Sequence, residues 1–211
     1  MDERSTRALG VASAIGGILL VLASIPPSWY GVPSLDSYVF DPSVGSPLWF
    51  HRTVVPVLSI LGVVGLSLGA VGLVQRDWGV AGRLRRWSGV LTVVSLGSLA
   101  VSVPLLSYVS FGDSGATSLA ILAGVVFAAI SVVVLTPALL LLGYAITRTE
   151  RPYVGYALLG VTVALPVAFA VTPAPFGSLV AALVVLAVGA VVGHDLYHYP
   201  GPLPERVPGG S

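Results

Sequence analysis

Six long apolar runs dominate the sequence and restrict what it can fold into. Each run is long enough, at about 1.5 Å per helical residue, to cross a bilayer core about 30 Å thick. A segment that crosses the bilayer has to satisfy its backbone polar groups internally, which favours helices. The sequence therefore predicts an all-α, polytopic transmembrane bundle. We expect its six helices at residues 8–25, 53–74, 88–109, 119–146, 153–171 and 178–194.

The segments between and after these runs complete the expected organisation. Residues 1–196 form a single transmembrane domain, and residues 26–52 are its one long connecting loop. Residues 197–211 are rich in proline and glycine and contain few apolar side chains, so we expect a disordered tail.

Charged residues are scarce, and this excludes several classes of protein. They make up 9% of the chain, whereas soluble domains carry about a quarter. Most of the surface must therefore face lipid. The net charge of +1 provides no basic excess for nucleic acid, so the expected partners are the lipid bilayer and either another protein or a second copy of the chain. Cysteine is absent, which excludes disulfides and cysteine-based metal centres, and we expect no cofactor.

The arginines predict how the chain crosses the membrane. All ten basic residues are arginine, and nine lie at the N-terminus, in residues 75–87, in residues 147–152 or in the tail. Alternating crossings place these four segments on one side and Arg52 on the other. Because Lys and Arg accumulate in cytoplasmic segments, we expect a protein of the cell membrane with both termini in the cytoplasm and loop 26–52 outside.

The overall composition suggests a group of organisms. A chain without lysine and rich in alanine, valine, glycine and arginine is typical of a high-GC genome. In this respect it resembles uncharacterised multi-pass integral membrane proteins of halophilic archaea. The resemblance is one of composition, extends loosely over the whole chain and implies no functional motif.

Loop 26–52 combines prolines with large aromatic side chains. Proline restricts the backbone and lowers the entropy cost of ordering it, and buried aromatic rings contribute apolar surface. Disordered linkers, by contrast, are poor in aromatic residues. We therefore expect an ordered external lid that serves as an interaction site. Its aromatic residues are Trp29, Tyr30, Tyr38, Phe40, Trp49 and Phe50.

Hydroxyl side chains form a stripe along the predicted helix at residues 88–109. At 100° per residue they fall within a sector of about 120°. Small hydroxyl residues allow helices to pack closely, but the same stripe in a bundle interior suits a path for a small uncharged solute. Packing is our preferred interpretation, as it is for the small-residue pairs Gly65/Gly69 and Gly189/Gly193, within the bundle or between protomers. The stripe contains Ser88, Thr92, Ser95, Ser98 and Ser102.

The acidic residues all lie outside the apolar runs, so the sequence offers no intramembrane carboxylate for proton-coupled transport. Asp195 is part of an HDLYH segment at the end of the last run. His194 and His198 are spaced i, i+4 and share a helix face, which makes them weak candidates for a metal site. No third ligand accompanies them, so we predict no metal and interpret them as interfacial histidines.

Residues 112–115, GDSG, resemble the nucleophile segment of trypsin-like proteases and the GxSG segment of rhomboid proteases. The rhomboid resemblance implies Ser114 as the nucleophile and His194 as the base. Ser114 precedes its helix, however, and His194 lies about 24 Å deeper at 1.5 Å per residue. A general base has to lie within about 3 Å of its nucleophile. We therefore interpret GDSG as a turn and predict no catalytic residue.

Three functional hypotheses remain, in order of preference. The first is a non-enzymatic membrane protein that interacts with partners or forms a complex. The second is a passive or facilitative pore or transporter for a small uncharged solute. The third is an intramembrane hydrolase.

The expected topology is testable because the chain contains no cysteine. Cysteines introduced at Ser43 and Ser114 should react with a membrane-impermeant maleimide on intact cells. Cysteines at Ala81 and Gly209 should react only after lysis. Labelling of Ala81 from outside would contradict a six-helix arrangement with cytoplasmic termini.

Overall fold

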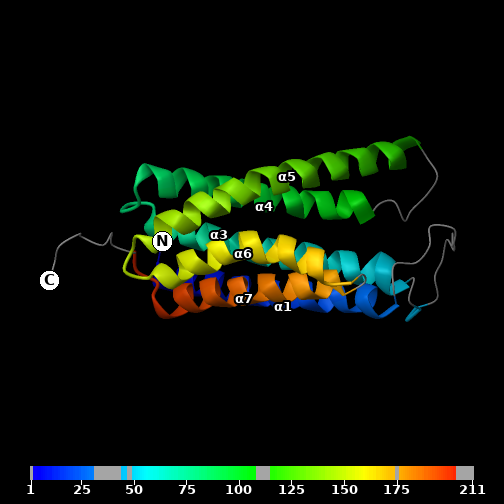
Figure 1. Cartoon of the computed structure of the whole chain (residues 1–211), viewed down its shortest axis with the longest axis horizontal. Helices are drawn as coiled ribbons and strands as arrows, with labels where there is room; N and C mark the ends of the chain where they lie inside the picture. The colour runs from blue at the N-terminus through cyan, green and yellow to red at the C-terminus, as the bar shows by residue number, and fades with distance from the viewer. Residues whose placement is uncertain (1, 31–43, 47–48, 108–114, 174–175, 203–211) are drawn as a thin grey trace.

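The computed structural model describes residues 2–30, 44–46, 49–107, 115–173 and 176–202 (Figure 1). The elements of this part of the chain are α1 (Glu3–Tyr30), the short π-helical segment η1 (Phe50–Val54), α3 (Val55–Asp77), α4 (Arg83–Ser107), α5 (Gly115–Thr147), α6 (Pro152–Val171) and α7 (Gly177–His198).

Six helices in the described residues are long and apolar enough to cross a membrane, and no strand occurs among those residues. The predicted all-α bundle is therefore confirmed. This architecture is consistent with a multi-pass membrane protein, because each helix satisfies its own backbone while presenting apolar side chains outward.

Several helices extend beyond the apolar runs that predicted them. α1 begins at Glu3, not at residue 8, and α4 begins at Arg83, not at residue 88. Glutamate and arginine are good helix formers, so a polar turn continues the helix past its apolar part. At the start of α1 the Asp2 carboxylate accepts a hydrogen bond from the backbone N–H of Ser5 at 3.1 Å. Hydrogen bonding from Ser5 lowers the pKa of Asp2.

α1 also continues past Pro26 and Pro27 to Tyr30, although the prolines suggested an end at residue 25. Each proline lacks an N–H group and so leaves a carbonyl of the preceding turn without its helical donor. Hydroxyl groups bond to the backbone here: Ser24 donates to the Val21 carbonyl at 2.7 Å and Ser28 to the Ser24 carbonyl at 2.8 Å. These bonds go to other carbonyls than those of Leu22 and Ala23, which the two prolines leave without a helical donor.

The six long helices lie side by side, and their contacts form a closed ring in which each helix packs against its neighbours in the chain. The order runs from α1 through α3, α4, α5 and α6 to α7, and α7 packs back against α1. α3 also contacts α7 across the ring. α1 begins and α7 ends at the same end of the bundle, and the α3–α4 and α5–α6 turns lie there too. We call it the arginine-rich end, because these segments contain most of the arginines.

Glycines allow α1 to pack closely between α3 and α7. A Cβ atom on Gly65 of α3 would lie 2.6 Å from the Ala12 carbonyl oxygen. One on Gly193 of α7 would lie 2.6 Å from the Gly10 carbonyl oxygen. Gly69 and Gly189 both approach Ser13. The two small-residue pairs of the sequence therefore face α1 of the same chain, which supports packing within the bundle.

Both ends of the predicted loop 26–52 belong to helices. Trp49 and Phe50 lie at the start of the η1–α3 helix and pack edge to face, with their ring centroids 5.2 Å apart. Tyr38 and Phe40, the expected centre of the lid, lie outside the described residues. Residues 203–211 of the predicted tail also lie outside them. The expected lid therefore stays a prediction.

The close packing of α1 and α3 predicts different effects for two Gly→Ala substitutions. Gly65→Ala should destabilise the protein by about 1–3 kcal/mol, because the new methyl group meets backbone atoms that cannot move aside. Gly160→Ala in α6, which would meet nothing within 4 Å, should be neutral or stabilising by up to about 1 kcal/mol. Unfolding free energies measured in mixed micelles test the pair. Equal effects would contradict the close α1–α3 contact.

Candidate functional site

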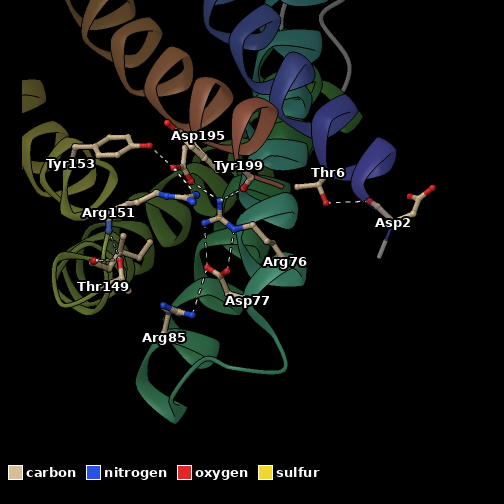
Figure 2. A network of polar contacts seen from close by, with 11 residues as sticks. Asp2, Thr6, Arg76, Asp77, Arg85, Thr149, Arg151, Tyr153, Asp195 and Tyr199 are labelled. Carbon is tan, nitrogen blue, oxygen red and sulfur yellow. Dashed lines mark hydrogen bonds and ion pairs between the residues drawn. The ribbon is translucent and has the colours of Figure 1, made fainter. Parts of the chain in front are cut away.

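A buried cluster of charged side chains lies at the arginine-rich end of the ring (Figure 2). It joins four helices and the α5–α6 turn, and we call it the ion cluster. Its charged members are Arg76, Asp77, Arg85, Arg151 and Asp195. The Arg76 and Asp195 side chains have no exposed surface. The cluster carries three positive and two negative groups, so it does not fully neutralise itself.

Arg76 occupies the centre of the ion cluster, at the end of α3. Its Nε and Nη2 atoms donate to the two carboxylate oxygens of Asp77, at 3.0 and 3.3 Å. Its Nη1 atom donates to Oδ2 of Asp195 on α7 at 2.5 Å, and also to the Tyr199 carbonyl at 3.4 Å. The rigid guanidinium fork thus binds two carboxylates at once, a geometry that the point charge of lysine does not provide.

Asp195 connects Arg76 to α6. Its Oδ1 atom accepts a hydrogen bond from the Tyr153 hydroxyl at 2.5 Å and lies 3.7 Å from Nη1 of Arg151. The Arg151 guanidinium in turn lies 3.8 Å from the centre of the Tyr199 ring, a cation–π arrangement. On the other side, Asp77 lies 3.7 Å from Nη2 of Arg85 in α4. One continuous set of contacts therefore links α3, α4, α6 and α7.

The sequence places Asp77 and Asp195 outside the apolar runs but does not predict that they are buried. Both lie at the ends of helices that qualify as membrane spans, and their side chains are buried against neighbouring helices. The sequence does contain a signal for this. Asp195 follows Val192 by three residues and Val188 by seven, which places it on the inward face of α7. A count of the charges inside and outside the apolar runs does not take this helical register into account.

The ion cluster is suited to holding helices together. Charges that leave water need partners with good geometry, and the contacts of Arg76 and Asp195 provide these. Removing Asp195 would leave Arg76 with Asp77 as its one carboxylate partner in the cluster, and three positive charges would face a single negative one. The cluster also links α3, α4, α6 and α7 to one another at this end of the ring.

A central cavity of about 200 Å³ lies deeper in the ring than the ion cluster. All six helices contribute to its lining, with one example each in Leu20, Leu66, Leu96, Leu139, Val161 and Val188. Ser13 and Thr92 supply its polar side chains within the described part of the chain. Its lining includes Leu73 and Val192, each three residues before a cluster member, so an apolar layer separates the cavity from the charges.

The hydroxyl stripe of α4 is mostly buried, but of its five members Thr92 alone lines the cavity. Ser88 donates to the Leu84 carbonyl at 2.8 Å, Thr92 to the Ser88 carbonyl at 2.9 Å and Ser102 to the Leu99 carbonyl at 2.7 Å. Ser98 is half-buried, and the Ser95 hydroxyl has no hydrogen-bond partner among the described residues. These bonds to the helix's own backbone support the packing interpretation over a polar path.

The histidines of the HDLYH segment point away from Asp195. His194 and His198 are exposed, with ring centroids 4.5 Å apart, while Asp195 between them is fully buried. The described residues contain no group of three or more potential metal ligands. The helix face shared by the two rings therefore lies outside the ion cluster.

Ser114 lies outside the described residues, but its neighbour Gly115 begins α5 at the end of the bundle opposite to His194 (Figure 1). α5 extends over 33 residues between these ends. The rhomboid-like pairing of serine and histidine is therefore not supported by the arrangement of the helices.

Comparisons of the chain with protein-family models, with curated proteins and with solved structures found no match. The function has to be inferred from the ion cluster and the cavity.

The ion cluster predicts a large and non-additive effect on stability. Asp195→Asn should destabilise the protein by about 3–5 kcal/mol, because it removes one of the two carboxylates that bind Arg76 and leaves the three arginines of the cluster with Asp77 alone. The double variant Arg76→Gln/Asp195→Asn should cost less than the sum of its single substitutions. Titration of the purified protein with SDS in mixed micelles measures these free energies.

Glu150→Gln is the control for this experiment, because Glu150 is an exposed acidic residue in the adjacent α5–α6 turn. It should change the free energy of unfolding by less than about 0.5 kcal/mol. If Asp195→Asn cost no more than this control, the cluster would not hold the helices together.

Proposed function

We propose that this chain is a non-enzymatic multi-pass membrane protein that binds an apolar molecule, of the kind found in lipid chains, at the centre of its helix ring. The observation that carries the proposal is the central cavity, to which all six helices contribute apolar side chains. The proposal places the protein in the cell membrane with the arginine-rich end in the cytoplasm, in accord with the distribution of arginine.

The chemistry of the cavity lining favours an apolar ligand over water or a polar solute. A water molecule in a cavity needs two to four polar partners, and apolar cavities of about 150 Å³ stay dry and accept molecules such as benzene. This cavity has a volume of about 200 Å³, and one of its two polar groups, the Thr92 hydroxyl, already donates to the backbone. The ligand would therefore be held by shape and dispersion contacts.

The ion cluster supports binding over free passage. A pore for uncharged solutes needs an exit at each end of the ring, and at one end the apolar layer and the cluster lie in the way. Opening this end would separate Arg76 from Asp195. A solute pore is therefore less well supported than a binding protein. Complex formation through loop 26–52 is compatible with the proposal and remains an expectation from the sequence.

Two phenylalanine substitutions in α6 test the proposal. Val161 is buried and lines the cavity, whereas Val163, two residues further on, is 65% exposed on the outer surface. Val161→Phe should fill the cavity and reduce the amount of copurifying apolar molecule by at least about tenfold. The reason is that a bulky ring would overlap with a close-packed ligand, which costs free energy. Val163→Phe should leave it unchanged.

Native mass spectrometry of protein released from micelles, followed by extraction and identification of bound molecules, provides the measurement. Retention by Val161→Phe of as much ligand as Val163→Phe would contradict binding in the cavity. A wild-type protein without any apolar adduct would also contradict it. Thermal unfolding of both variants in detergent shows whether the ring is intact.

A further inference from the structure

A second hollow lies on the surface of the arginine-rich end, at the turn between α3 and α4, and is separate from the central cavity. Its volume is about 450 Å³. It is lined by Trp78, Ala81, Arg83, Arg86, Trp87 and Val90, and we call it the Arg–Trp pocket. It combines two guanidinium groups, two indole rings and a small apolar wall.

Arg83 and Arg86 differ from the other two arginines of this region. Arg76 and Arg85 form ion pairs within the ion cluster. Arg83 and Arg86 form none with any carboxylate of the described residues. Arg86 lies over the Trp78 ring at 5.7 Å, and its Nε atom is buried without a hydrogen-bond partner in this part of the structure. The pocket therefore has a positive charge that the described protein does not neutralise.

The position of the Arg–Trp pocket indicates where its ligand comes from. Trp78 follows the last residue of α3 and Trp87 lies in the second turn of α4, so both are at the ends of membrane-spanning helices. Their side chains are 50% and 61% exposed. Exposed tryptophan at the end of a span sits at the level of the lipid headgroups. A pocket at this level is within reach of lipid headgroups.

We propose that the Arg–Trp pocket binds the phosphate headgroup of an anionic membrane lipid. Arginine forks match the oxygen geometry of phosphate, and a positive pocket beside membrane helices concentrates anionic lipids. Ala81 and Val90 provide apolar contact for the part of the lipid next to the phosphate, and the indole rings flank it. This site is independent of the apolar molecule proposed for the central cavity.

The first measurement uses the wild-type protein alone. Purified protein in a neutral detergent is titrated with phosphatidylglycerol or with phosphatidylcholine of the same acyl chains, and bound lipid is counted by native mass spectrometry. Phosphatidylglycerol should bind at least about tenfold more tightly, because each basic group near an anionic headgroup contributes a several-fold factor. Equal binding of the two lipids would overturn the proposal.

The second measurement compares two double variants that each remove two positive charges. Arg83→Gln/Arg86→Gln alters the pocket and should reduce the preference for phosphatidylglycerol by at least about tenfold. Arg4→Gln/Arg148→Gln is the matched control, since both arginines are exposed on the same end of the bundle and outside the pocket. The control should keep the preference. An equal loss in both double variants would show general attraction, not a site, and would overturn the proposal.

A third measurement distinguishes a lipid ligand from a soluble anion. Inorganic phosphate at millimolar concentration, added to the phosphatidylglycerol complex, should displace little of the lipid, because the lipid also contacts the apolar wall. Complete displacement would assign the pocket to a soluble anion and overturn the lipid assignment. Thermal unfolding of both double variants checks their fold. If the pocket variant does not fold, the wild-type titration and the phosphate arm decide the question.

Discussion

The pairing of Arg76 with Asp195 is the interaction on which the arginine-rich end of the bundle depends. A charge within packed membrane helices is tolerated only when it is paired. Here the guanidinium binds carboxylates from its own helix and from α7, and Tyr153 donates to the second oxygen of Asp195. Because these hydrogen bonds need their donors and acceptors in specific positions, they fix the register of α7 against α3. Apolar packing alone would allow neighbouring registers to compete with it.

The rest of the ring combines close packing on one side with free space at the centre. Glycine and serine bring α1 against α3 and α7 until backbone atoms nearly touch. Leucine and valine line the middle, where side chains from all six helices meet around the central cavity. The glycine contacts of α1 and the ion cluster hold the helices in place around this space.

The six helices could be predicted because the length of an apolar run is visible directly in the sequence. Their ends could not, since the charged and polar residues at 3–7 and the three arginines at 83, 85 and 86 lie outside the apolar runs and are still helical. The burial of Asp195 was not predicted, because two exposed histidines flank it and because burial depends on helical register. Its partner lies 119 residues earlier in the chain. The cavity depends on how side chains from six helices meet, and no local sequence pattern records this.

The contact between α7 and α1 has a consequence for how the protein is made. The first helix is synthesised long before the last, so its glycine-lined face toward α7 has no partner until α7 has been made. Arg76 likewise has Asp77 on its own helix, but its second carboxylate, Asp195, lies on the last helix. The ring closes only where α7 packs against α1, so a chain that ends before α7 lacks both this contact and the second carboxylate of Arg76.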